Sequence, residues 1–292
     1  MGKMKTFFPS LKLLLTVRKY NRGVFDMNEK KYFDINNNRL VYIGSKSDNE
    51  YWDNHWDNDK FEKNIKNSRN FLVSNTTKKY LPKGSEILEG GCGIGQNVYL
   101  IEKQGYKCTG LDYAQKTVDK IKELVPDMDV RLGDVRNLEF KDNSFDGYWS
   151  LGVIEHFYNG YGEIINEMNR VIKKDGILFL TVPSMSWLRE YKAKNNKYPV
   201  WIESEENIEN FYQFALNPKK VIKDFEDIGF ELLEQKPYDG FKGLKDEIRF
   251  LKKPMQFMYD SDFIILKVIR KIIDFFIKNF TSHMTLFVFR KL

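Results

Sequence analysis

A glycine-rich turn that follows an acid-ended apolar segment is the part of this chain best suited to hold a ligand. Residues 87–95 read Ile-Leu-Glu-Gly-Gly-Cys-Gly-Ile-Gly, so a short strand ends at Glu89 and glycine then occupies every second position. Glycine adopts positive φ and lets a ligand approach the backbone closely. The helix predicted over 96–103 would present its first N–H groups to that ligand. The spacing therefore predicts a nucleotide-binding turn.

Two further segments carry a carboxylate at or near their end, and a third leads to a histidine. The segment 106–112 ends in Asp112, and the segment 130–135 ends in Gly-Asp-Val with Asp134 at its centre. The segment 144–156 reads as a strand that runs into Glu-His. In an open α/β sheet, an acid at the end of the second strand lies beside the first glycine turn. We therefore expect Asp112 to accept hydrogen bonds from both ribose hydroxyls.

The spacing of the glycines indicates which nucleotide binds. A dinucleotide-binding turn counted from Gly91 needs a glycine at position 96, where this chain has Gln96. The pattern G-x-G-x-G over 91–95 resembles motif I of the class I S-adenosylmethionine-dependent methyltransferases. The acid-ended segments described above are similar to further elements of that family, in the same order. A tight loop without a ligand is the alternative for the glycine turn taken alone.

This resemblance implies S-adenosyl-L-methionine as the cofactor. It implies that Asp112 binds the ribose, and that Asp134 and the backbone N–H after it bind the adenine. The residues that the resemblance places around the cofactor are Glu89, Gly91, Cys92, Gly93, Gly95, Asp112, Tyr113, Asp134, Val135 and Ser150.

The same resemblance implies an α/β fold, a Rossmann-like doubly wound sheet of seven strands in the order 3-2-1-4-5-7-6, with strand 7 antiparallel. We expect this domain over 64–292, because strands and helices alternate there. Residues 1–63 would form a basic and aromatic extension that covers the cofactor, with 51–56 as an aromatic lead-in. The segments 184–216 and 236–282 are expected insertions that shape the acceptor pocket, and the second, between strands 6 and 7, is expected to be helical.

The reaction itself makes few demands on side chains. Methyl transfer from a sulfonium is an in-line displacement, so the protein mainly aligns the reactants and excludes water. An oxygen or carbon acceptor also loses a proton, and His156 is the best placed of three histidines to take it. The alternative for His156 is a structural or cofactor-positioning role. Glu155 could orient His156 or assist a metal, although one Glu-His pair is no coordination set and no metal is expected.

Absent motifs narrow the class of acceptor. No Pro-Pro-Tyr or Pro-Pro-Phe follows Asp146 or Ser150, which argues against methylation of adenine or glutamine nitrogen. The stretches 144–146 and 155–157 are most similar to small-molecule methyltransferases that modify quinones, sterols and sugars. We predict methyl transfer to an oxygen or carbon of a small or lipid-linked acceptor. The alternatives are a nicotinamide-dependent reductase and a non-catalytic peripheral membrane module that retains a nucleotide pocket.

The net charge of +6 is concentrated at the two ends of the chain. Residues 1–25 carry six basic and no acidic residues, and residues 263–292 carry six basic residues and one acid, which leaves 26–262 at −5. An acidic body without a basic stripe argues against nucleic acid as a partner. Two cysteines are too few for a disulfide framework, and no convincing secretory signal is seen, so we expect a cytoplasmic protein.

Both ends also carry apolar residues at helical spacing, over 7–19 and over 263–280. In the second segment, isoleucine and phenylalanine surround a narrow polar stripe that consists of Lys267, Lys271, Asp274 and Lys278. These central charges argue against a membrane span. A helix this apolar must nevertheless be covered. The alternatives are packing on its own domain, a peripheral position at the inner face of the membrane, and a homodimer contact.

Overall fold

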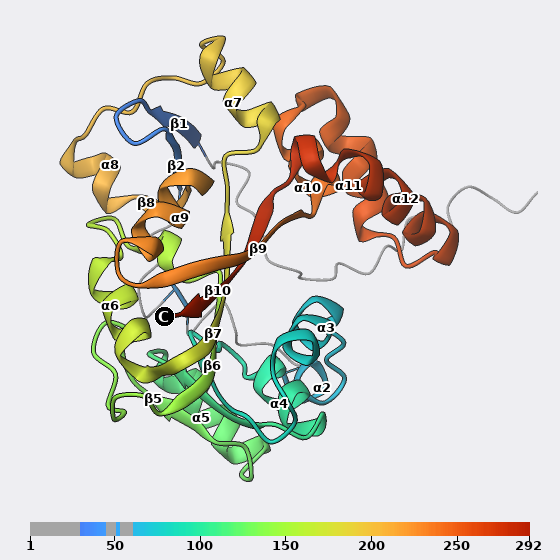
Figure 1. The fold of residues 1–292 in the computed structure, drawn as a ribbon. Helices are drawn as coiled ribbons and strands as arrows, with labels where there is room; N and C mark the ends of the chain where they lie inside the picture. The colour runs from blue at the N-terminus through green and yellow to red at the C-terminus, as the bar shows by residue number, and fades with distance from the viewer. Residues whose placement is uncertain (1–29, 45–50, 53–60) are drawn as a thin grey trace, which may run out of the picture.

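One large sheet forms the centre of the fold, and a small sheet lies beside it (Figure 1). The computed structural model describes residues 30–44, 51–52 and 61–292. The predicted apolar helix at 7–19 and the lead-in residues 53–56 therefore lie outside the described residues.

The large sheet has seven strands in the order β5-β4-β3-β6-β7-β10-β9. Only β10 runs antiparallel to its neighbours, β7 and β9. This confirms the predicted Rossmann-like fold and its strand order. The strands are β3 (Glu86–Gly90), β4 (Lys107–Asp112), β5 (Val130–Leu132), β6 (Phe145–Leu151), β7 (Ile172–Pro183), β9 (Phe230–Tyr238) and β10 (Met284–Lys291).

Helices cover both faces of this sheet, and the alternation along β10 shows the two layers. Leu286 and Val288 pack in one cluster with α2 (Phe61–Lys66), α3 (Phe71–Tyr80), α4 (Gln96–Lys103) and α5 (Gln115–Leu124). Phe287 and Phe289 pack on the opposite face with α6 (Gly162–Val171) and α9 (Pro218–Glu226). Successive side chains of a strand point to opposite faces, so one strand contributes to both cores.

Local capping residues set several helix boundaries. The helices α2 and α3 are separate because Asn70 caps α3 by accepting a hydrogen bond from the Val73 N–H at 3.2 Å. Asn217 caps α9 by accepting a hydrogen bond from the Lys219 N–H at 3.0 Å.

The small sheet was not predicted. It contains β1 (Lys30–Asp34), β2 (Arg39–Ile43) and β8 (Phe211–Ala215) in that order, all antiparallel. The β1–β2 turn includes Asn38 at φ 47°, a left-handed conformation that asparagine tolerates. Between β7 and β8 lie α7 (Trp187–Lys194) and α8 (Glu205–Glu209). The segment 184–216 therefore contributes a strand as well as helices.

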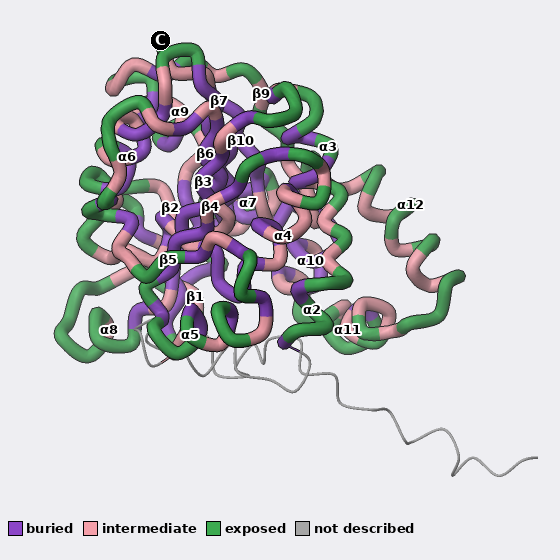
Figure 2. Tube along the Cα trace, turned by 90° about the horizontal axis from the view of Figure 1, so that it is seen from below, coloured by how far each residue is buried: buried purple, intermediate pink, exposed green. Residues whose placement is uncertain are grey.

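After β9 the chain forms a helical projection at the edge of the molecule (Figures 1 and 2). It consists of α10 (Gly240–Glu247), the 3₁₀ turn η3 (Arg249–Leu251), α11 (Lys252–Asp260) and α12 (Ile264–Thr281). The expected helical insertion between strands 6 and 7 is therefore present. Most apolar residues of α12 do not pack on their own domain, because only Thr281 of this helix is buried. None of the described helices is long and apolar enough to cross a membrane.

Candidate functional site

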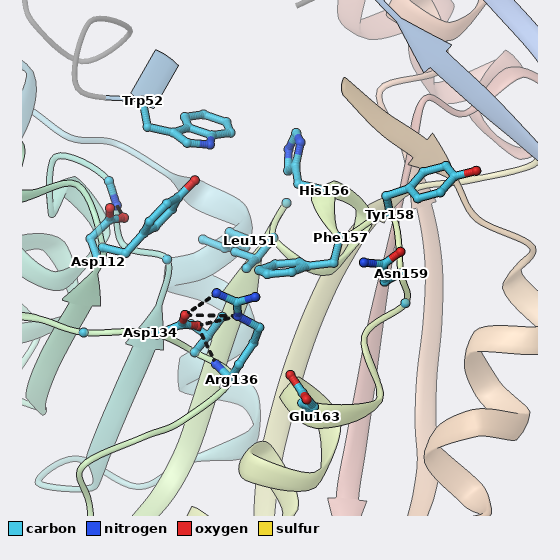
Figure 3. A pocket seen from close by; sticks show the side chains of 18 of the residues that line it. Trp52, Asp112, Asp134, Arg136, Leu151, His156, Phe157, Tyr158, Asn159 and Glu163 are labelled. Atoms are coloured by element: carbon cyan, nitrogen blue, oxygen red, sulfur yellow. Dashed lines mark hydrogen bonds and ion pairs between the residues drawn. The ribbon is translucent and has the colours of Figure 1, made fainter. Parts of the chain in front are cut away.

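A cavity of about 780 Å³ opens at the carboxyl ends of β3, β4, β5 and β6 (Figure 3). Six residues predicted to hold the cofactor line it: Gly91, Gly93, Asp112, Tyr113, Asp134 and Val135. His156 and Trp52 also line it. The other predicted residues do not line it and are buried; these are Glu89, Cys92, Gly95, Ser150 and Glu155.

The glycine turn has the backbone conformation that its sequence predicts. Gly91, Gly93 and Gly95 have φ of 75°, 51° and 70°, which disfavours any other residue type. A Cβ on Gly91 would lie 2.5 Å from Val153 Cγ2, and one on Gly95 would lie 2.7 Å from Met128 Cε. The turn is therefore a close backbone cradle at the floor of the cavity.

Asp112 holds this cradle in place. Its Oδ2 accepts a hydrogen bond from the Gly93 N–H at 2.7 Å, and its Oδ1 accepts one from the Ala114 N–H at 3.0 Å. The residue is only 6% exposed, yet it lines the cavity. Each carboxylate oxygen can accept a second hydrogen bond. Asp112 can therefore bind two neighbouring hydroxyls while it fixes the turn.

Asp134 also lines the cavity and is paired with Arg136. The Arg136 Nη2 donates to Asp134 Oδ2 at 2.6 Å, and the Arg136 backbone N–H donates to Oδ1 at 2.8 Å (Figure 3). The hydrogen bond from Arg136 lowers the pKa of the Asp134 carboxyl. The side chain is 41% exposed, so the carboxylate remains accessible as an acceptor for an exocyclic amine.

Glu89 and Cys92 lie behind the turn. The Oε1 of Glu89 accepts from Asn97 Nδ2 at 2.9 Å, which ties β3 to the first turn of α4. Burial raises the pKa of Glu89 to about 8, so this carboxyl is mainly protonated at pH 7. Burial also raises the pKa of the Cys92 thiol well above its usual value, so Cys92 is not a thiolate nucleophile. Ser150 is fully buried at the end of β6.

His156 lies in the 3₁₀ turn η2 (Ile154–His156) that follows β6. Its Nδ1 is 2.8 Å from the backbone oxygen of Tyr212 on β8. A carbonyl oxygen only accepts, so Nδ1 carries the proton and Nε2 is the basic nitrogen of the neutral ring. Trp52 and Tyr212 contact the imidazole edge-on, with ring centroids 5.1 Å and 5.2 Å away. The ring is therefore fixed in orientation at the rim of the cavity.

Glu155 does not orient His156, because the backbone of Tyr212 makes that hydrogen bond instead. The Glu155 side chain is 2% exposed, and its Oε2 has no hydrogen-bond partner among the described residues. Burial raises the pKa of Glu155 to about 8. Within the described ranges, no group of three or more His, Cys, Asp or Glu side chains gathers to hold a metal ion.

Several lining residues were not predicted. Arg136, residues 157–160 and the first two residues of α6 line the cavity, and Tyr212 orients the histidine. A signal for the loop was present, since residues 157–163 read Phe-Tyr-Asn-Gly-Tyr-Gly-Glu directly after His156. Aromatic and glycine residues at the exit of a central strand are typical of a ligand-facing loop.

The segment that builds the cofactor side of the cavity matches a known family. Residues 88–180 match the family described as "Methyltransferase domain". Over this region the chain is similar to the class I S-adenosylmethionine-dependent methyltransferases. The residues of the methyltransferase domain fit that cofactor, since the glycine cradle, Asp112 and Asp134 line one cavity.

Curated methyltransferases are similar to between a third and a half of this chain. A probable S-adenosylmethionine-dependent methyltransferase of Mycolicibacterium smegmatis is 32% identical over 35% of this chain and 39% of its own. The 2-methyl-6-phytyl-1,4-hydroquinone methyltransferase of Synechocystis is 34% identical over 34% of this chain and 32% of its own. The demethylmenaquinone methyltransferase of Staphylococcus aureus is 27% identical over 54% of this chain and 73% of its own. The chain thus spans a third to two fifths of the first two relatives.

Solved structures share the fold of the methyltransferase domain. A methyltransferase from Methanosarcina mazei has a TM-score of 0.51 at 18% identity, and covers 77% of this chain and 99% of its own. One from Archaeoglobus fulgidus has a TM-score of 0.50 at 17% identity, and covers 79% of this chain and 98% of its own. At these identities the likeness concerns the fold alone.

Replacing Asp134 with alanine should weaken S-adenosylmethionine binding by about tenfold, since one charge-assisted hydrogen bond contributes roughly 1.5 kcal/mol. Asp129→Ala is the matched control, because Asp129 is similarly exposed and pairs with Arg131 Nη2 at 2.9 Å, but lies outside the cavity. Isothermal titration calorimetry compares the two variants. Equal weakening by both would contradict an adenine contact at Asp134.

Replacing Glu155 with glutamine should stabilise the domain at pH 8 and not at pH 5. The folded chain holds the Glu155 proton up to a pH of about 8, whereas an unperturbed glutamate releases it near 4.5. The stability contributed by protonated Glu155 is therefore full below pH 4.5 and falls as the pH rises to about 8. We expect a gain of about 1–2 kcal/mol at pH 8 in thermal unfolding. Exposed Glu226→Gln is the control, and a gain independent of pH would contradict the prediction.

Proposed function

We propose that this protein transfers a methyl group from S-adenosylmethionine to an oxygen or carbon of a small or lipid-linked acceptor. One observation supports this most directly: the cavity that contains the glycine cradle and Asp112 is also lined by His156. A cofactor-holding side and a proton-accepting side thus share one enclosed space. That arrangement suits a transfer in which the acceptor loses a proton.

The chain's own groups have distinct tasks in this proposal. When bound, S-adenosylmethionine supplies an electrophilic methyl group on a sulfonium. The glycine cradle and Asp112 hold its ribose, and Asp134 with the Val135 N–H holds its adenine. His156 Nε2 accepts the acceptor proton, since Nδ1 is committed to the Tyr212 carbonyl. The aromatic side chains at the rim exclude water from the reacting atoms.

An aromatic or isoprenoid acceptor fits the lining best. Trp52, Tyr113, Phe157 and Tyr158 line the cavity, and large aromatic side chains bind flat apolar groups well. Relatives named as hydroquinone and demethylmenaquinone methyltransferases favour a quinol ring for this chain as well. Such acceptors carry long apolar tails and reside in membranes, so the proposal includes a peripheral position of the protein at the inner membrane face.

Calorimetric titration with S-adenosylmethionine, S-adenosylhomocysteine and a nicotinamide dinucleotide tests the cofactor assignment. We expect micromolar binding of both sulfur nucleotides and no heat from the dinucleotide. A screen of quinols and lipid-linked sugars, read by S-adenosylhomocysteine release, then tests the acceptor class. Binding of the dinucleotide alone would overturn the proposal, and cofactor binding without turnover on any acceptor would favour a non-catalytic module.

A further inference from the structure

Helix α12 presents its polar side to the protein and its apolar side to the solvent. Asp274 Oδ1 accepts a hydrogen bond from the Phe241 N–H at 2.9 Å, and Thr281 Oγ1 donates to the Gly240 oxygen at 2.9 Å. The backbones are in close contact, since a Cβ on Gly240 would lie 2.5 Å from Lys278 Cα. These contacts fix the rotation of α12 about its own axis, so the helix cannot turn its other side inward.

The outward side is a continuous apolar surface, which we call the α12 apolar face. Its side chains are between 39% and 72% exposed and comprise Ile264, Ile265, Val268, Ile269, Ile272, Phe275, Phe276 and Phe280. Phe257 on α11 is also 68% exposed. An exposed apolar surface of this extent marks an interaction site on a soluble domain.

Another cavity, of about 460 Å³, is lined by the polar side of α12 together with residues of α3, β9 and α10, and we call it the α12 cavity. Four cations line it, namely Lys236, Arg270, Lys271 and Lys278, against the two acids Asp239 and Asp274. Arg270 is directed by a hydrogen bond from its Nη1 to the Tyr259 oxygen at 2.8 Å. Lys236 and Lys271 form no ion pair with the residues that the structure describes. The cavity is thus a cationic site with unneutralised charge.

Both cavities are at the same end of the large sheet. The α12 cavity includes Tyr238 at the end of β9, which runs parallel to β7 because both are antiparallel to β10. The cofactor cavity opens beyond the ends of β3 to β6. A membrane surface that touches the helical projection would therefore lie at the end of the sheet where the cofactor cavity opens.

Charge decides between the occupants that could cover the α12 apolar face. Residues 249–281 carry seven basic and three acidic residues, so a second copy of the projection would bring like charges together. The segment 1–25 of this chain has six basic and no acidic residues, so it too would be repelled. An anionic lipid surface satisfies both the apolar side chains and the surrounding cations.

We propose that the α12 apolar face inserts into the surface of an anionic bilayer, and that the α12 cavity binds the phosphate-bearing headgroup of one of its lipids. The inference rests on the proposed function only in giving the docked protein a membrane-resident acceptor. The apolar side chains then lie at the headgroup boundary. Lys236, Lys271 and Lys278 then lie around the phosphate.

Vesicle flotation of the full chain is the direct test. Vesicles of phosphatidylcholine alone are compared with vesicles that also contain phosphatidylglycerol, at low and high salt. We expect binding only to the anionic vesicles and weakening of this binding by salt. Calorimetric titration with S-adenosylmethionine runs in parallel on every variant, so that loss of vesicle binding and loss of the cofactor site are read separately.

Two variants separate the apolar face from the cationic cavity. Phe276→Ser and Lys271→Glu should each weaken binding to anionic vesicles by about tenfold, while cofactor binding stays unchanged. Their matched controls are Ile202→Ser, which removes an equally exposed apolar side chain elsewhere (72% against 69% for Phe276), and Lys174→Glu, at an exposed lysine on β7. Neither control should change vesicle binding.

Each contrary result identifies another occupant. Equal binding to neutral vesicles, or no effect of Lys271→Glu, would overturn the headgroup site. A rise in melting temperature with inorganic phosphate but no vesicle binding would assign the cavity to a free anion and overturn the bilayer proposal. A dimer in light scattering that Phe276→Ser dissociates, without vesicle binding, would assign the face to a second copy.

Discussion

Asp112→Ala should weaken S-adenosylmethionine binding by at least about a hundredfold. The variant loses the acceptor for two ribose hydroxyls, and charge-assisted hydrogen bonds of this kind contribute roughly 1.5–3 kcal/mol each. It also removes the acceptor of the Gly93 N–H at 2.7 Å, so the glycine cradle loses the contact that fixes it. Calorimetry with S-adenosylmethionine and S-adenosylhomocysteine measures the loss.

The control for this variant is Asp119→Ala on α5. Asp119 lies at the surface and accepts a hydrogen bond from Gln115 Nε2 at 2.8 Å. The variant therefore removes a carboxylate that does not line the cavity. Thermal unfolding of both variants shows whether the fold is kept. Unchanged cofactor affinity in a folded Asp112→Ala chain would reject the ribose assignment.

His156→Ala should leave cofactor affinity within about twofold and lower turnover by roughly 100-fold to 10,000-fold, the range typical for loss of a general base. The reason is geometric, because Nε2 is the basic nitrogen at the cavity rim once Nδ1 donates to the Tyr212 oxygen. Turnover is measured as S-adenosylhomocysteine release on a quinol acceptor identified by the screen. The deficit should shrink at high pH, where solvent can take the proton.

His156→Asn separates base catalysis from positioning. The asparagine Nδ2 occupies nearly the position of imidazole Nδ1 and can donate to the same Tyr212 oxygen, but asparagine has no basic nitrogen. If His156 is the base, asparagine and alanine should be equally slow. Recovery of turnover by asparagine alone would show that the side chain only tethers β8 to η2.

The cofactor half of the fold could be predicted because its signals are local. A glycine turn, the Asp112 strand end and the Gly-Asp-Val element each occupy a few consecutive residues. The order of the strands then follows from the family resemblance over 64–292, and the structure places Gly91, Asp112 and Asp134 in one cavity.

The rest depends on contacts between distant segments. β2 and β8 are separated by about 170 positions along the chain, and each strand of the small sheet is only five residues long, so no single stretch indicates that β2 and β8 pair. The sequence also does not indicate which side of α12 faces the protein. Periodicity identifies an apolar side but not which side meets the protein, and here Gly240 and Gly243 admit the backbone of the polar side.

The hydrogen bond between His156 and Tyr212 has a further consequence for how new acceptor preferences can arise. Tyr212 belongs to β8, a strand of the small sheet, whereas the glycine cradle and both acids lie within 88–180. The proton of the imidazole is therefore placed by a part of the chain that does not hold the cofactor. Exchange of this small sheet between homologues would alter the choice of acceptor. The same exchange would change which imidazole nitrogen of His156 is basic, with the cofactor half left intact.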